Sequence, residues 1–341
     1  MIEILATNCL VTKGYNRSLL CDLHRFKWWA IPNEVASYIL AEDFETLKRE
    51  HQDLYDLLRE QDSIIQIPEA DRHLFPAFNL DYEIPRQIEQ AIIDWDENYS
   101  TYNILELVKE LKSLDCKHIA LRFYSIFDQN ILELILNEIK GSTIHTIEIL
   151  MPYSMFCADS SFFLDLYTKN LRLIEIILHS CSNISLIPIE FKEQDWLKFT
   201  KQKIDDCSAC GQVSPLYFGL SVPHHALTKN FNNCLYKKIG IDVIGNIKNC
   251  PSSNDVLGIV NKDKLSEIIV NSKYKKIGKI TKEQIEVCKD CEFRSICSDC
   301  RIYVDNPKDM YSRPAKCEYN PYISKWKGEK GFLPVKNTKE P

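Results

Sequence analysis

The chain has 341 residues and a formal net charge of -6 at pH 7, with 45% hydrophobic and 26% charged residues. This length and composition exclude a fibrous or largely disordered chain and predict two or three folded domains. The acidic balance, without a sustained basic stripe, argues against nucleic acid as a partner. The first residues lack a signal-peptide pattern and no apolar run approaches about 18 residues, so we expect a cytoplasmic protein without a membrane segment.

Residues 1–82 predict a small α+β unit at the front of the chain. Its expected elements are strands at 5–13, 17–23 and 27–32, helices at 35–40 and 46–60, and a strand at 63–67. Two interpretations of this unit remain open. It is either a plain α+β cap or an element that resembles the winged-helix unit that binds leader peptides, where a strand edge accepts the leader as an extra strand.

Residues 83–205 alternate between helical and strand patterns. The expected helices lie at 104–114, 131–139 and 162–167, and the expected strands lie at 118–125, 145–154 and 171–180. The strands recur about every 26 to 30 residues, which is the spacing of βα units and predicts a parallel sheet. Only about four such units fit before Cys207. We therefore predict an α/β fold with a shortened, open barrel.

The polar residues of this middle region show no hydrolytic constellation. Asp94 and Asp96 are expected to be solvated at a polar helix end, and His118, His145 and His179 are expected to be hydrogen-bonded or exposed at strand edges. No glycine-rich phosphate loop occurs, so the chain should not bind a nucleotide in a standard P-loop or Rossmann manner.

The fourteen cysteines fall into two groups. The scattered ones are expected to be small buried hydrophobic residues, and they are Cys9, Cys21, Cys116, Cys157 and Cys181. The clustered ones are Cys207, Cys210, Cys234, Cys250, Cys288, Cys291, Cys297, Cys300 and Cys317. In a reducing compartment such a cluster indicates metal binding rather than disulfides.

Four of these residues, Cys288 to Cys300, follow the spacing C-x2-C-x5-C-x2-C. A C-x2-C pair brings two sulfurs to one site, which suits either tetrahedral zinc or an iron–sulfur cluster. The five-residue interval between the pairs is short for a zinc ribbon. Eight or nine thiolates provide ligands for two sites. We therefore favour two [4Fe–4S] clusters and keep two zinc sites as the alternative.

The cysteine-rich region 206–341 resembles the SPASM domain, the auxiliary iron–sulfur module of peptide-modifying radical SAM enzymes. Cys234, Gly245 and Cys250 read C-x10-G-x4-C, followed by the four-cysteine motif and Cys317. The chain departs from the SPASM pattern in having two residues, not three, before Cys300. The stretches NNCLYKKIGIDVIGNIKNCPS, EVCKDCEFRSICSDCR and KCEYNPY are similar to maturases of the grasp-with-spasm peptide systems.

The resemblance implies a ligand set for each cluster. Cys288, Cys291, Cys297 and Cys317 would hold one, and Cys234, Cys250, Cys300 and a fourth ligand would hold the other. Cys210 is the preferred fourth ligand, with Cys207, His224 or His225 as alternatives. Whether the clusters are structural, and supply folding energy to a region with little core, or redox-active stays open.

The C-x3-C-x2-C triad that holds the catalytic cluster of radical SAM enzymes is missing from the sequence. The resemblance therefore implies peptide maturation but no S-adenosylmethionine site and no independent radical catalysis. The first hypothesis is an accessory protein that binds a precursor peptide and assists a partner ATP-grasp ligase. The alternatives are a redox or radical-type peptide-modifying enzyme that uses an open cluster iron, and a zinc-stapled scaffold.

Overall fold

The computed structural model describes residues 1–187, 189–298 and 300–335. The chain forms two compact units from interleaved segments. The first unit contains Met1–Glu83, Gln212–Asn233 and Lys279–Pro341, and the second contains Ile84–Gly211 and Cys234–Gly278. In the described part of the chain, no helix has the length and apolarity that crossing a bilayer requires.

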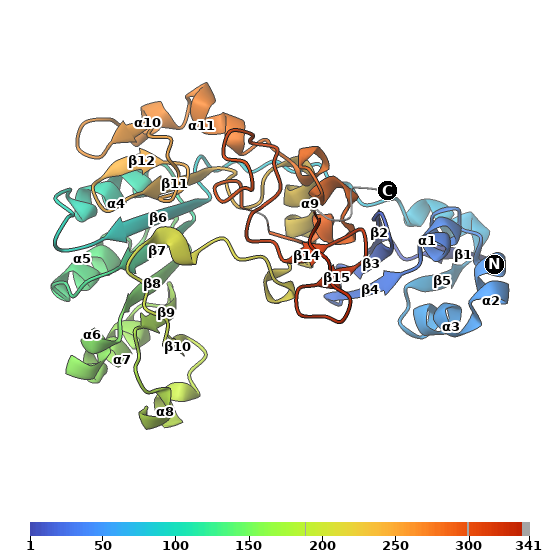
Figure 1. Ribbon diagram of the computed structural model, residues 1–341, viewed down its shortest axis with the longest axis horizontal. Coiled ribbons are helices and arrows are strands. Elements are labelled where there is room, and N and C mark those ends of the chain that lie inside the picture. The colour runs from blue at the N-terminus through green and yellow to red at the C-terminus, as the bar shows by residue number, and fades with distance from the viewer. Residues whose placement is uncertain (188, 299, 336–341) are drawn as a thin grey trace. The chain divides into compact units, whose positions relative to one another are not determined.

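The second unit is built on an eight-stranded sheet in the order β10-β9-β8-β7-β6-β11-β12-β13 (Figure 1). Its strands are β6 (Gln90–Trp95), β7 (His118–Phe123), β8 (Thr146–Pro152), β9 (Leu173–His179), β10 (Leu197–Phe199), β11 (Lys238–Ile241), β12 (Asn246–Lys248) and β13 (Gly258–Ile259). Strands β6 to β10 run parallel, and β11 joins them parallel to β6. The predicted α/β class with an open, parallel-rich sheet is confirmed.

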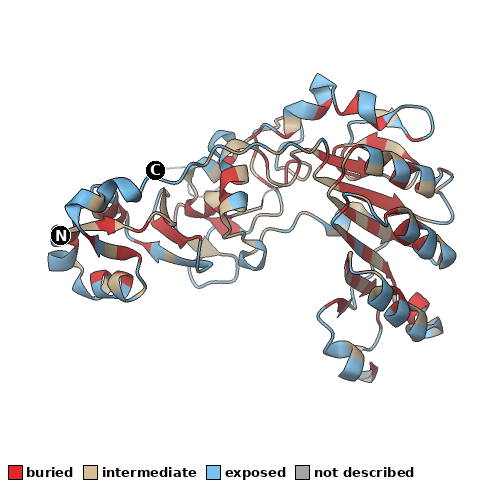
Figure 2. Ribbon diagram, turned by 180° about the vertical axis from the view of Figure 1, so that it is seen from behind, coloured by how far each residue is buried: buried red, intermediate tan, exposed pale blue. Residues whose placement is uncertain are grey.

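Helices cover one face of this sheet (Figure 1). The helices of the unit are α4 (Ile104–Ser113), α5 (Asn130–Glu138), α6 (Tyr153–Ala158), α7 (Ser160–Lys169), α8 (Ile189–Lys192), α10 (Leu265–Ile268) and α11 (Ser272–Ile277). Strand β7 shows how the sequence directs this packing. Ile119, Leu121 and Phe123 are buried in the core, whereas the alternate residues Ala120 and Arg122 lie on the other face. Figure 2 shows buried residues along the strands and along one side of each long helix.

The first unit combines an antiparallel sheet with helices and the cysteine-rich region. Its strands are β1 (Ile2–Leu5), β2 (Cys9–Lys13), β3 (Ser18–Asp22), β4 (Lys27–Ile31), β5 (Ile64–Ile67), β14 (Tyr319–Asn320) and β15 (Lys325–Trp326). Its helices are α1 (Asn33–Leu40), α2 (Phe44–Glu50), α3 (Gln52–Glu60) and α9 (Val222–Asn230). Strands β2, β3 and β4 form the predicted three-stranded meander, and β1 pairs with β5.

The central strand β3 is buried along its whole length because a core lies on each of its faces. Leu20 packs with residues of α1 to α3, such as Val35 and Leu47. Leu19 and Cys21 pack instead with Phe293, Ile296 and Tyr319 of the cysteine-rich region. Full burial of an aliphatic or aromatic side chain contributes about 1.5–3 kcal/mol, so this second core ties the cysteine-rich region to the sheet.

Two local expectations were wrong. The helix expected at 46–60 is two helices, α2 and α3, because His51 leaves the helical region with φ -138° and ψ 54°. Cys157 is exposed rather than buried, while Cys9, Cys21, Cys116 and Cys181 are buried as expected.

Candidate metal centre

Cys288, Cys291, Cys297 and Cys317 line one small cavity in the first unit. Short turns position them. The Cys291 amide donates to the Cys288 carbonyl at 3.0 Å, which closes the first C-x2-C pair. The Cys297 amide donates to the Phe293 carbonyl at 2.9 Å and thereby places the third thiol. Cys317 lies far along the chain but reaches the same cavity, so the structure brings together the complete first ligand set of the sequence analysis.

The thiols of this cavity need a compensating positive charge in order to ionise. Burial raises the pKa of the Cys291 thiol well above its ordinary value, and the charges of Glu292, Cys288 and Cys297 raise it further. Several neighbouring thiols therefore cannot ionise together unless a positive centre compensates them. Among the described residues, no three His, Cys, Asp or Glu side chains converge tightly enough to hold a single metal ion.

A buried polar network supports the wall of the cavity. Glu292 is fully buried, accepts from Arg17 Nε at 2.6 Å and accepts from the Tyr319 hydroxyl at 2.5 Å. The guanidinium of Arg17 also donates to the Tyr319 hydroxyl at 3.2 Å. These bonds fix the chain directly after Cys291 against the β2–β3 hairpin.

The second unit gathers Cys210, Cys234 and Cys250 around Lys238. Lys238 is 4% exposed as a residue, and its Nζ atom lies 3.7 Å from Cys234 Sγ. Burial alone would lower the pKa of Lys238, but the neighbouring thiols of Cys234, Cys250 and Cys210 raise it. Burial raises the pKa of Cys250 to about 11, although Lys238 opposes this shift. Three of the four residues of the second predicted ligand set thus surround one buried ammonium group.

The remaining candidate ligands are divided between the two units. Cys300 is buried in the first unit, whereas the other three residues of its predicted set belong to the second. Cys207 lies near Cys210, and its carbonyl accepts from Ser252 Oγ at 3.3 Å. His224 and His225 lie on α9 of the first unit.

His225 provides a stability prediction. Burial and Lys229 lower the pKa of His225 from 6.5 to about 4. The unfolded chain therefore binds an extra proton between these values, so stability is complete above pH 6.5 and falls as the pH drops toward 4. We expect His225→Gln to remove up to roughly 3 kcal/mol of this loss. Denaturant unfolding at pH 7 and pH 5 checks this, and an unchanged pH slope in the variant would contradict it.

The open face of the sheet carries a polar site that the sequence analysis missed. Asp94 is not solvated at a helix end but lies on β6, 2% exposed, with Arg122 Nε 2.6 Å from its Oδ1. Burial raises the pKa of Asp94, and Arg122 opposes the shift. Arg122, Tyr124, Glu148 and Cys210 line a cavity of about 190 Å³ on this face.

The histidines at the strand edges are hydrogen-bonded, as expected. His179 is buried, with Nε2 3.3 Å from the Phe123 carbonyl and Nδ1 3.0 Å from Ser180 Oγ. His118 bonds to Thr146, and Arg86 Nη2 lies 3.0 Å from His145 Nε2.

A family comparison covers two cysteines of each predicted ligand set. Residues 233–292 match SPASM, an iron–sulfur cluster-binding domain. The matched segment contains Cys234, Cys250, Cys288 and Cys291. This SPASM match bears out the resemblance of the cysteine-rich region and the expectation of iron–sulfur binding. Comparison with curated proteins gives no match.

Solved structures of SuiB from Streptococcus suis show a distant likeness. The S-adenosylmethionine complex of SuiB is 10% identical at a TM-score of 0.35, with 91% of this chain and 98% of SuiB covered. SuiB without a named ligand is 10% identical at a TM-score of 0.34. SuiB bound to its precursor peptide SuiA is 9% identical at a TM-score of 0.30. In both of these, 92% of this chain and 99% of SuiB are covered.

Proposed function

We propose that this protein takes part in the maturation of a ribosomally synthesised precursor peptide. It binds the precursor and assists a partner ATP-grasp ligase, and it carries two auxiliary [4Fe–4S] clusters. The observation that carries the proposal is the cavity shared by Cys288, Cys291, Cys297 and Cys317, in a region that overlaps the SPASM match.

The donor set of this cavity fits an iron–sulfur cluster. Four thiols line one cavity, and several of them pack against apolar side chains. Among the described residues, they do not converge on a single point. This arrangement suits a cluster, in which each thiolate binds a different iron. Cys210, Cys234, Cys250 and Cys300 are the proposed ligands of the second cluster. The buried ammonium of Lys238 beside three of them would offset the negative charge of such a centre.

The N-terminal sheet supports the peptide-binding part of the proposal. Strands β2 and β4 are the edges of a three-stranded antiparallel sheet, and an extended peptide can add to such an edge. Trp28 of β4 is 36% exposed and stacks edge-on against Phe293 at 5.4 Å, so an aromatic side chain is held beside the edge.

Coexpression with a precursor peptide and an ATP-grasp ligase of a grasp-with-spasm system tests the function. We expect mass spectrometry to find the loss of one water per new ester or amide link only when this chain is present. Modification that proceeds equally without the chain would remove the accessory role. Anaerobic analysis of the purified chain should give about eight irons and eight sulfides.

A second candidate function rests on the cavity beside Cys210. Tyr124 is buried there and the Arg122 side chain is 15% exposed, on the face of the sheet opposite α4 and α5 (Figure 1). Such a site suits a peptide-modifying enzyme in which an open iron lies near a substrate. An unchanged absorption spectrum in Cys210→Ala would favour this candidate, whereas the loss of one cluster would place Cys210 among the ligands.

A further inference from the structure

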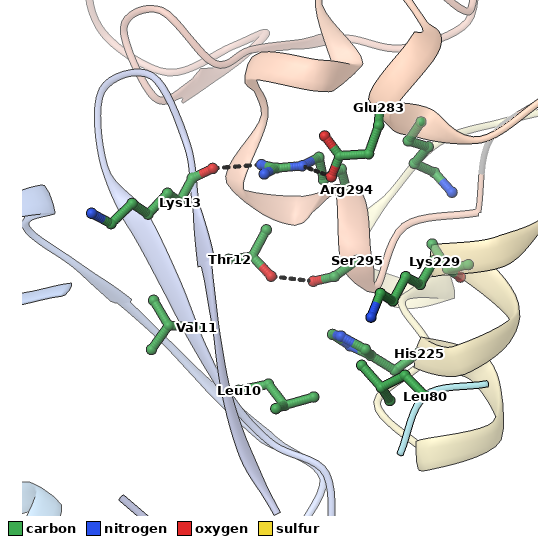
Figure 3. A pocket seen from close by; sticks show the side chains of 12 residues that line it. Leu10, Val11, Thr12, Lys13, Leu80, His225, Lys229, Glu283, Arg294 and Ser295 are labelled. Carbon is green, nitrogen blue, oxygen red and sulfur yellow. Dashed lines mark hydrogen bonds and ion pairs between the residues drawn. The ribbon is translucent and has the colours of Figure 1, made fainter. Parts of the chain in front are cut away.

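A second cavity, of about 260 Å³, lies within the first unit, on the side of β2 that faces α9 and the cysteine-rich region (Figure 3). Its lining combines apolar and polar side chains. The apolar ones are Leu10, Val11 and Leu80, and the polar ones are Thr12, Lys13, His225, Thr228, Lys229, Lys282, Glu283, Arg294 and Ser295. None of these residues belongs to the two proposed ligand sets, in which His225 was only an alternative to Cys210.

The charges around the cavity leave a positive excess. Glu283 is the acidic residue of the lining, and its Oε1 is bonded to Arg294 Nε at 2.6 Å. Arg294 is held further by the Lys13 carbonyl, which accepts from its Nη1 at 2.5 Å. The Glu283 charge is therefore balanced inside the lining. Three lysines, Lys13, Lys229 and Lys282, add cationic side chains, and the ammonium of Lys13 donates to Ser37 Oγ at 3.2 Å. Figure 3 shows the ammonium of Lys229 directed into the cavity.

His225 supplies an independent sign of a ligand. Its side chain is 7% exposed and points into the same space as Lys229 in Figure 3. The Nδ1 atom has no hydrogen-bond partner among the described residues. An unsatisfied buried nitrogen costs about 1–3 kcal/mol, so a ligand oxygen that bonds to it would recover this free energy. A carboxylate oxygen is a suitable acceptor for an Nδ1 hydrogen and a suitable partner for Lys229.

The edge of β2 points to a peptide as the carrier of that carboxylate. Gly14 donates to Arg17 and Leu23 donates to Asn8 across the β2–β3 pair, at 3.0 and 2.9 Å. This antiparallel register directs the backbone of Leu10 and Thr12 to β3 and that of Val11 and Lys13 to the outer edge. The bond from Arg294 to the Lys13 carbonyl agrees with this direction. The cavity contacts four consecutive residues of β2, so it lies along this edge.

We propose that this cavity binds the carboxylate side chain of an acidic residue in a peptide that lies along the outer edge of β2. Lys229 and His225 contact the carboxylate, and the Val11 backbone contacts the peptide. The choice of a peptide as the carrier rests on the proposed function, whereas the anion site rests on the cavity alone.

The test is a calorimetric titration of the anaerobically prepared full-length chain with capped tetraglutamate and capped tetraglutamine peptides. We expect tetraglutamate to bind and tetraglutamine to bind at least about tenfold more weakly, because a charge-assisted hydrogen bond is lost. Lys229→Met should weaken tetraglutamate binding about tenfold, and His225→Phe should weaken it as well. Lys48→Met, at an exposed lysine of α2 in the same unit, is the matched control and should bind like the unmodified chain.

Four results would overturn the proposal. Equal binding of the two peptides would show that the cavity does not recognise a carboxylate. Weakening of tetraglutamate binding by Lys48→Met as large as that by Lys229→Met would indicate general charge attraction. Competition by inorganic phosphate as effective as that by tetraglutamate would indicate a small-anion site without peptide contacts. If tetraglutamate fails to bind while ligase-dependent modification still requires the chain, the cavity assignment falls and the proposed function stands.

Discussion

Replacing Cys291 by alanine should lower the iron and sulfide content of the anaerobically purified chain from about eight to about four each. Cys291 shares the cavity with Cys288, Cys297 and Cys317, and burial together with the charges of Glu292, Cys288 and Cys297 raises the pKa of its thiol. Without its thiolate, one iron of that cluster has no protein ligand. Metal ligation also supplies folding free energy, so the first unit should unfold at a lower denaturant concentration.

Matched cysteine variants make this result specific. Cys157→Ala changes an exposed cysteine of α6 and should keep the full iron content. Cys234→Ala should remove the other cluster and leave the absorbance of the first one in place. Cys291→Ser keeps an oxygen ligand and controls for simple misfolding. Its iron and sulfide content should lie between those of the unmodified chain and the alanine variant. Full iron content in Cys291→Ala would contradict the ligand assignment.

The first cysteine set was predictable because its ligands are mostly local. Three of its members lie within ten residues, and the spacing alone brings their sulfurs to one side of short turns. Cys317 required the resemblance to the SPASM pattern, because nothing in its own surroundings points to the cavity. The strands and helices of the middle region were predictable for a similar reason, since their periodicity is a property of each segment.

The sites that depend on pairing between distant segments were not predictable. Asp94 lies just before the largely polar stretch 96–100 and resembles part of a solvated helix end, yet the pairing of β6 with β7 buries it against Arg122. The cavity beside β2 needs α9, more than two hundred residues further along the chain. The histidine pair after Pro223 has no local signal that shows which ring is left without a partner. Tertiary context decides each of these cases.

The ion pair between Asp94 and Arg122 leads to the second large effect, on the stability of the second unit. Arg122→Met should lower the free energy of unfolding by about 3–5 kcal/mol, because it leaves the Asp94 carboxylate buried without its partner. The Tyr102 hydroxyl donates to the backbone carbonyl of Asp94 at 2.6 Å and does not compensate the charge of the carboxylate. Hydrogen exchange of peptides from β6 and β7 in increasing urea reports this unit separately from the first.

A double variant separates the loss of the pair from the loss of packing. Asp94→Asn together with Arg122→Met removes both charges and should recover much of the stability lost in Arg122→Met, because the cost arises from the unpaired buried charge. Lys169→Met breaks an exposed ion pair on α7 and should change stability by at most about 0.5 kcal/mol. If Arg122→Met were as mild as Lys169→Met, water would reach Asp94 from the cavity on the open face. The polar face would then be a hydrated surface. The second candidate function, a substrate site beside Cys210, would no longer be supported by a buried charged pair.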